Sequence, residues 1–259
     1  MKKIFSILFF LLLSNLIKAQ IGDSLISKNN FYGDFGDSLA LNDSIAQAHY
    51  AVVDAYVLHL KKRYRNIPSL AKDLTATFTS PEDKVRAIFR WMTNNISYDC
   101  ADYHNKNKTL GGGVSYSSTT SKSQITAQWA NMYYRYANRV LRKRKGICEG
   151  YAILFYELCN QSGINCEIIH GFADQNSKRI GKYKTFHRKF TNHAWDSVEL
   201  NGNWYDLDAT WASGSCDEEV RHFYKGFNAA YYLTSAKKSF ADHIQSIKET
   251  EKLNRDIGN

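Results

Sequence analysis

Apolar residues recur at three- and four-residue intervals along several stretches of the chain, and this spacing predicts amphipathic helices. The clearest helix start is Ser80-Pro81-Glu82-Asp83, where a serine can cap the helix, a proline suits its first turn and two acids lie near its positive end. We expect helices over about 44–63, 80–95, 125–144 and 148–162, whereas 70–78 is either a short helix or an irregular link.

The predicted helix over 125–144 carries an aromatic and apolar stripe at helical spacing, which is typical of a core-facing side. The segment before it, 99–124, has the composition of a loop and includes three consecutive glycines. It is either a lid over a site or a flexible insertion, and we favour the insertion because most loops only connect. The residues of the stripe are Trp129, Met132, Tyr133, Tyr136 and Val140.

After Gly163 the pattern changes from helical spacing to strand-like runs over 166–172, 192–200 and 204–211. The last two runs are joined by Asn201-Gly202, which is the strongest short hairpin signal. Helices followed by antiparallel strands predict an α+β fold with the helices packed on an antiparallel sheet.

The hairpin fixes which residues become neighbours. In a two-residue turn Leu200 faces Asn203, so His193 would face Thr210, and Asp208 would lie on the same face as His193 and diagonal to it. The opposite face is apolar apart from one aspartate, so we expect the sheet to bury that side. The other side would present His193, Trp195, Trp204, Asp206 and Asp208.

Cys148 lies in the stretch KGICEGYAILFYELCNQSG, between Gly146 and Gly150 and at the start of a predicted helix. The positive end of a helix dipole favours a thiolate, and flanking glycines leave room for a substrate, so this is the setting of a nucleophile. The alternative is a small buried cysteine without chemistry. From this stretch alone the two interpretations are equally good.

A histidine and a carboxylate that could serve this thiol occur together in the hairpin, as His193 and Asp208. Each could instead be a structural residue that bonds a neighbour. Asp206 competes for the role of the carboxylate, and His170 and His187 are rival bases, but neither of these histidines has a carboxylate partner in the same hairpin.

The first twenty residues, with a lysine pair, an apolar run from Ile4 to Leu13 and a cleavage point near Ala19, read as a secretory signal peptide. This stretch is too short for a stable membrane span, so we expect a secreted or periplasmic protein rather than a cytoplasmic one. Removal of residues 1–20 would lower the formal net charge from +9 to about +6. Basic residues cluster only over 139–145, at a predicted helix end, so we expect no nucleic-acid partner.

Export would permit disulfides. If one cysteine stays reduced as a nucleophile, the other four allow three pairings, which the sequence leaves open. Neither a CxxC nor an HExxH motif occurs, so we expect no metal and no other cofactor. These four are Cys100, Cys159, Cys166 and Cys216.

Three ordered motifs resemble the transglutaminase-like superfamily, whose members are cysteine enzymes with a papain-like fold. They are GICEGYAILFYELCNQSGI, NHAW and WYDLDATW, with IFRWMTNNISYD before them and YYLTSAKKSFADH after them. The motifs, read together with the residues that flank them, are most similar to the branch that includes kyphoscoliosis peptidase and cytokinesis-associated proteins. The resemblance covers about 80–243.

The resemblance implies that Cys148 is the nucleophile, His193 the general base and acid, and Asp208 the carboxylate that orients the imidazole. It implies a catalytic domain over 44–243, with a flexible leader over 21–43 and a helical tail over 244–259. The backbone N–H of Cys148 is the expected first oxyanion donor. Trp129 or a residue of 99–124 could be the second, and Trp129 and Trp195 are candidates for contacting substrate.

The implied reaction breaks a peptide or amide bond of a peptide or protein substrate through a thioester on Cys148, and water is favoured over an amine as the final acceptor. A cross-linking transglutaminase would use the amine. A binding or scaffold module that keeps only the fold is the contrasting class. The sequence does not indicate the oligomeric state.

Overall fold

A computed structural model of the chain describes residues 40–60, 62–105, 122–174, 191–236 and 240–245. These residues form two compact units, 40–60 and 62–245, and each is described by itself. The predicted signal peptide, most of the predicted leader and His187 lie outside the described residues.

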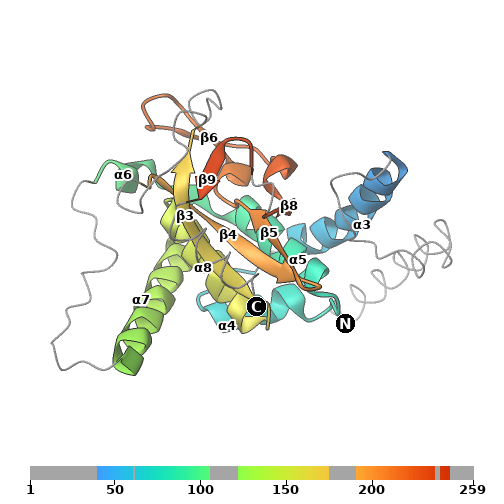
Figure 1. Cartoon of the computed structure of the whole chain (residues 1–259), viewed down its shortest axis with the longest axis horizontal. Coiled ribbons are helices and arrows are strands. Elements are labelled where there is room, and N and C mark those ends of the chain that lie inside the picture. Colours follow the sequence, from blue (N-terminus) through green and yellow to red (C-terminus); the bar gives the residue numbers. More distant parts are fainter. Residues whose placement is uncertain (1–39, 61, 106–121, 175–190, 237–239, 246–259) are drawn as a thin grey trace. The chain divides into compact units, whose positions relative to one another are not determined.

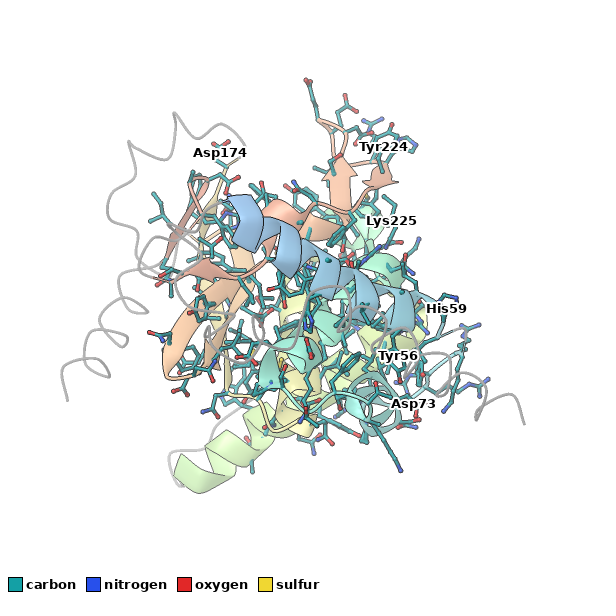
Figure 2. The ribbon with its side chains drawn as sticks, turned by 90° about the vertical axis from the view of Figure 1, so that its right-hand side faces the viewer. Tyr56, His59, Asp73, Asp174, Tyr224 and Lys225 are labelled. Carbon is teal, nitrogen blue, oxygen red and sulfur yellow. The ribbon has the colours of Figure 1, made fainter. Side chains whose placement is uncertain are left out.

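The first unit is one helix, α3 (Ala40–Leu58), which starts four residues before the predicted position and ends five residues before it. The His59 ring closes its last turn, because Nδ1 donates to the backbone oxygen of Ala55 at 2.6 Å (Figure 2).

The helices of the second unit follow the sequence pattern closely. Residues 70–78, which the pattern left open, belong mostly to a helix whose N-cap is Asn66; its side-chain oxygen accepts from the backbone N–H of Ser69 at 2.9 Å. Ser80 caps the next helix as predicted and accepts from the N–H of Asp83 at 3.1 Å. The bounds are α4 Ile67–Thr75, α5 Pro81–Asn95, α6 Cys100–Tyr103, α7 Lys122–Lys143 and α8 Cys148–Gln161.

An antiparallel sheet with the order β8-β5-β4-β3-β9 packs on α8, which contacts the two central strands β4 and β3 (Figure 1). Helices α4, α5 and α7 pack around α8 in turn. The fold is therefore the predicted α+β arrangement of helices on an antiparallel sheet. The strands are β3 Cys166–Ala173, β4 His193–Leu200, β5 Asn203–Leu207, β8 Thr234–Ser235 and β9 His243–Gln245.

Two short ribbons lie beside this core. In the parallel pair, β1 leads into α6 and β2 leads into α8. In the antiparallel pair, Tyr224 and Lys225 belong to β7, and the Lys225 ammonium donates to the backbone oxygen of Ile96 at 2.5 Å (Figure 2). The bounds are β1 Ser97–Tyr98, β2 Lys145–Gly146, β6 Gly214–Cys216 and β7 Phe223–Lys225, with short 3₁₀ helices η2 Trp211–Ser213 and η3 Ala229–Tyr231.

The hairpin has the predicted register, since Leu200 pairs with Asn203 and Asp196 with Leu207. Asn201 and Gly202 have φ values of 53° and 77°, as a type I′ turn requires. The predicted strand over 204–211 is too long, because β5 ends at Leu207 and the chain turns into η2.

The sheet does not leave the face of His193 open, contrary to the expectation. All side chains from His193 to Val198 are buried, and Trp195 is 1% exposed in a cluster with Ile169 and Phe240. Sequence periodicity missed this because the cover comes from β9 and the segment before it, far along the chain. Ile244 and Gln245, which were assigned to a helical tail, end this strand.

The aromatic stripe of α7 is only half in the core. Tyr136 and Val140 are buried, but Trp129 is 38% exposed, so the prediction is wrong for the N-terminal half of the described stripe. The predicted loop over 99–124 begins with α6 instead, and the choice between lid and insertion falls on 106–121, outside the described residues. Within the described ranges, the helices are all too short or too polar to span a bilayer.

Candidate active site

Cys148 is the first residue of α8, and one residue, the N-cap Ile147, separates it from the β2 strand. Its thiol is half-buried and unbonded to another cysteine. Gly150 keeps this helix start close to α7, because a Cβ at Gly150 would meet the Val140 side chain at 3.0 Å. The backbone N–H groups of a first helical turn lack intrahelical acceptors, so they are available to bind an anion beside the sulfur.

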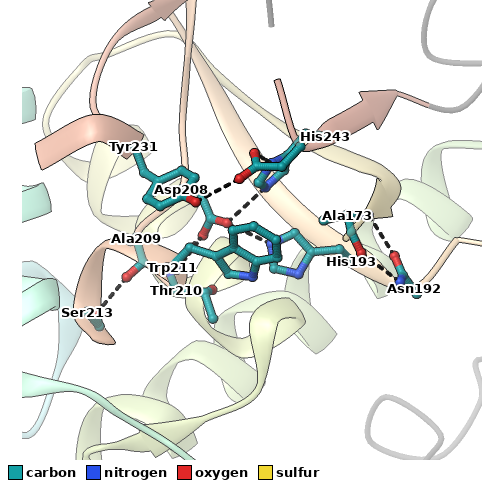
Figure 3. Close-up of polar contacts among 11 residues, drawn as sticks. Ala173, Asn192, His193, Asp208, Ala209, Thr210, Trp211, Ser213, Tyr231 and His243 are labelled. Atoms are coloured by element: carbon teal, nitrogen blue, oxygen red, sulfur yellow. Dashed lines mark hydrogen bonds and ion pairs between the residues drawn. The ribbon is translucent and has the colours of Figure 1, made fainter. Parts of the chain in front are cut away.

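His193 is the first residue of β4, and its Nε2 lies 2.7 Å from Oδ2 of Asp208 (Figure 3). Both side chains are buried, with relative exposures of 8% and 0%. Since Nε2 is bound to the carboxylate, Nδ1 is the ring nitrogen left for the thiol. Cys148 is near enough to act on the imidazole, since it contributes to raising the pKa of His193.

Asp208 lies just beyond the end of β5, in the turn before η2. Its Oδ1 accepts from the backbone N–H groups of Thr210 at 2.7 Å and Trp211 at 3.1 Å, while Oδ2 points to His193 (Figure 3). A side chain that bonds the backbone two and three residues on is typical of an aspartate turn. The hydrogen bonds of this turn therefore hold the carboxylate in position, whereas the sequence predicts that strand pairing does so.

Charge pairing dominates the titration of these two groups. Burial opposes ionisation of His193, but the Asp208 carboxylate, with smaller contributions from Cys148, raises the pKa of the imidazole to about 10. Burial would likewise raise the pKa of Asp208, but the His193 charge and the bonds from His193 and His243 hold it well below its usual range. Together these shifts favour an imidazolium–carboxylate pair.

A second histidine reaches the same carboxylate oxygen. Nε2 of His243 lies 3.2 Å from Oδ2 of Asp208, and this side chain is fully buried. His193, Asp208 and His243 offer ligand atoms within 4.8 Å of one another, a set that could in principle hold a metal ion. The spacing of 2.7 Å between His193 and Asp208 is that of a hydrogen bond, so a metal would first have to displace a bonded proton. Motif searching missed this set because its members are far apart in sequence.

His170 and Asp206, the alternatives to His193 and Asp208, have other hydrogen-bond partners. His170 does meet a carboxylate, since its Nε2 lies 3.1 Å from Oε2 of Glu149, but that glutamate belongs to α8 rather than to the hairpin. Asp206 is fully buried, and its Oδ2 accepts from Gln245 at 3.3 Å. Burial raises the pKa of Asp206.

The two tryptophan candidates lie in different places. Trp129 is on the exposed part of α7, edge-on to Tyr133 with the ring centres 6.1 Å apart. Trp195 fills the core and stacks on His193, so it supports the imidazole from behind.

Sequence reasoning missed Tyr98, on β1. Tyr98 pairs with Gly146, two residues before Cys148, and burial, with a smaller contribution from Cys148, raises the pKa of its hydroxyl. The position lies one residue outside the segment searched for a second oxyanion donor. The parallel pairing of β1 with β2, just before Cys148, explains this neighbourhood, but pairing between two-residue strands leaves no periodic signal.

Several known proteins are similar to the chain in sequence. Human and mouse kyphoscoliosis peptidases are each 28% identical to the chain, over 187 and 184 residues, and the matches cover 72% and 71% of it but 24% of each relative. The Lim and transglutaminase domain protein ltd-1 of Caenorhabditis elegans is 25% identical over 167 residues, which are 64% of this chain and 19% of that protein. The chain thus spans about a quarter or less of the length of these relatives.

A crystal structure of a TGase is 15% identical, with a TM-score of 0.33, and the match covers 84% of this chain and 42% of that one. The sequence model of the Transglutaminase-like superfamily matches residues 68–209, a range that includes Cys148, His193 and Asp208. Because that match covers more than half of the chain, the protein belongs to the transglutaminase-like superfamily.

Proposed function

We propose that the protein is a cysteine enzyme that opens peptide or amide bonds through a thioester on Cys148, with water as the final acceptor. The observation that carries the proposal is the buried His193–Asp208 pair at 2.7 Å, whose remaining imidazole nitrogen is left for the thiol at the start of α8. Membership of a family that includes kyphoscoliosis peptidase supports the same chemistry.

The Cys148 proton rests on Nδ1 of His193, as a thiolate–imidazolium pair that agrees with the raised pKa of the imidazole, and in the first step the sulfur attacks the carbonyl carbon. The carbon–nitrogen bond then breaks, and His193 returns the proton to the leaving amine, so a thioester remains. In the second step His193 takes a proton from water, the oxygen attacks the thioester carbon, and the carbon–sulfur bond breaks to give the acid and the thiolate, which restores the pair with the imidazolium. Asp208 stabilises the imidazolium in both steps and holds Nε2–H, which leaves Nδ1 to exchange the proton.

The developing negative charge on the carbonyl oxygen needs fixed donors. The backbone N–H of Cys148, at the positive end of α8, supplies one by its position in the helix. For the second donor the sequence offered Trp129 or a residue of 99–124, and the hydroxyl of Tyr98 is a further candidate beside the thiol.

The test is selective alkylation of the native protein with iodoacetamide, followed by peptide mass mapping. We expect Cys148 to react faster than the other four cysteines near neutral pH and His193→Ala to remove that selectivity, because the imidazole provides the thiolate. Equal, slow reaction of all five thiols would instead favour a scaffold that keeps only the fold. Cys148→Ser is the control for the assignment.

Hydrolysis and acyl transfer differ in the second acceptor. Peptide libraries incubated with the purified protein, with and without a primary amine, should give products with the mass of the free acid in both cases. Products that carry the amine would favour a cross-linking transglutaminase instead.

We also propose export, on the basis of the signal-like residues 1–20. N-terminal sequencing of the protein recovered from its native compartment should start just after Gln20. A chain that retains Met1 in the cytoplasm would contradict export without affecting the chemistry.

A further inference from the structure

The catalytic carboxylate is shared by two imidazoles. Oδ2 of Asp208 lies 2.7 Å from Nε2 of His193 and 3.2 Å from Nε2 of His243 (Figure 3). His243 comes from the edge strand β9, which β4 and β3 separate from β5, and its side chain has no exposed surface. The mechanism above uses His193 and leaves this second ring without a role.

The chain of bonds continues beyond His243. Its Nδ1 lies 2.7 Å from Oδ1 of Asp242, and Oδ2 of Asp242 accepts from the Tyr231 hydroxyl at 2.8 Å. Both ring nitrogens of His243 therefore face carboxylate oxygens. An ionised carboxylate only accepts hydrogen bonds, so a ring nitrogen that bonds one donates to it, and the ring bridges the two acids.

Aromatic side chains enclose this bridge. The ring centre of His243 lies 4.6 Å from that of Trp211, 4.9 Å from that of Trp195 and 4.9 Å from that of Phe240, with the first two rings edge-on. Inside such an apolar surrounding a charged bond is stronger than in water, and a group left without its partner is costly.

We propose that His243 is a positioning residue of the active site, which holds Oδ2 of Asp208 toward His193 while Asp242 and Tyr231 hold His243. With Oδ1 fixed by two backbone N–H groups and Oδ2 fixed by two imidazoles, the carboxylate cannot rotate away from its productive orientation. The inference rests on the proposed role of His193 and Asp208 and adds a residue outside the family match over 68–209.

A pair of variants separates this role from space filling. In His243→Gln the amide nitrogen can take the place of Nε2 and keep the bond to Asp208. In His243→Asn the shorter amide can take the place of Nδ1, which keeps the bond to Asp242 and leaves Asp208 without the donor. The two variants remove the same ring, and they differ by one methylene group and by the acid that they can reach.

The first measurement is the pH profile of Cys148 alkylation in both variants. We expect His243→Asn to lower the rate constant near neutral pH by roughly 10- to 100-fold, the usual loss when a group that orients a catalytic side chain is removed. His243→Gln should recover most of it. Thermal unfolding of both variants, monitored by circular dichroism, checks that they fold alike. Equal rates in the two well-folded variants would overturn the proposal.

The second measurement does not depend on any activity. The proton between His193 Nε2 and Asp208 should give a strongly downfield NMR signal, which should persist in His243→Gln and weaken or shift in His243→Asn. If this pattern is found while Cys148 is unreactive in the wild type, the positioning role stands and the proposed function fails. If Cys148 is selectively reactive but the NMR signal and the alkylation rate are the same in both His243 variants, only the positioning role fails.

Discussion

Asp208 is the residue on which most of the local chemistry converges, because one carboxylate orients a ring, accepts two backbone bonds and meets a second histidine. Sequence reasoning found Asp208 and His193 because a two-residue turn makes residues fifteen apart into neighbours. It missed His243, which lies 35 residues beyond Asp208 on a strand of three residues. No periodic pattern is readable over so short a strand.

The Asp208→Asn variant keeps the shape of the side chain and removes its negative charge, so it tests what the charge does for His193. The amide oxygen can still accept from Thr210 and Trp211, which leaves the amide nitrogen facing Nε2 of His193. A donor there favours the imidazole tautomer with its proton on Nδ1, which cannot take a proton from the thiol. We expect turnover to fall by about 10³- to 10⁴-fold.

The measurement is kcat with a peptide found in the library screen, together with the alkylation rate of Cys148. Glu199→Gln is the matched control, since Glu199 pairs with Trp204 in the same hairpin away from the thiol, and should leave kcat unchanged. An Asp208→Asn variant that keeps wild-type turnover would remove this carboxylate from the mechanism.

The His193–Asp208 pair should also make folding stability depend on pH. The folded pKa of His193 is raised to about 10, above its ordinary unfolded value near 6.5, so the stabilisation is complete below the unfolded value and is lost as pH rises through about 10. The difference in unfolding free energy between wild type and His193→Gln should thus shrink by about 4 kcal/mol between pH 6.5 and pH 10. Urea unfolding at several pH values measures it, and a constant difference would contradict the raised pKa.

At the scale of elements, the hairpin was predictable in register but not in extent. Asn201-Gly202 fixes the pairing, whereas the end of β5 at Leu207 depends on the side-chain bonds of Asp208. The edge strand β9 was not predictable. Gly171 on β3 marks its approach, since a Cβ there would lie 2.2 Å from the backbone oxygen of Ile244.

Gly171→Ala should therefore displace β9 and, with it, His243. We expect a loss of at least about 1 kcal/mol of unfolding free energy and a slower alkylation of Cys148, because the added methyl overlaps backbone that cannot move freely. Gly226→Ala is the matched control, since a Cβ at Gly226 meets nothing within 4 Å. If both variants behave like wild type in urea unfolding and alkylation, β9 does not support the site.

Two further elements are poised for a covalent link. The sulfur atoms of Cys100, at the start of α6, and Cys216, at the end of β6, lie 3.9 Å apart, and the Cys159 thiol lies close enough to that of Cys166 to affect its pKa. These contacts favour one of the three pairings that the sequence left open. Incubation with oxidised glutathione should join Cys100 to Cys216 by exchange, releasing two molecules of reduced glutathione, and should raise stability by about 2–4 kcal/mol.

Peptide mapping without reduction identifies the link, and Cys216→Ser should abolish both the linked peptide and the gain in stability. The disulfide would connect α6 to β6, in the segment that follows Asp208. α6 comes just after β1, and β1 pairs with β2, which precedes Cys148. Persistence of all thiols after oxidation would contradict this prediction.

At the scale of the whole molecule, the matched family region and the complete site do not coincide. The match ends at residue 209, yet β8, β9, Phe240 and His243 complete the sheet and cover Trp195. A chain that ends after Ala236 should therefore keep Cys148, His193 and Asp208 but expose Ile169 and Trp195 and leave Asp208 without its second imidazole. We expect lower thermal stability and loss of selective alkylation at Cys148, because buried apolar surface and the second bond to Oδ2 are removed together.

A chain that ends after Gln245 retains every described contact of β9 and is the matched control. If the shorter chain unfolds at the same temperature as this control and alkylates Cys148 as fast, the C-terminal strand is dispensable for the site.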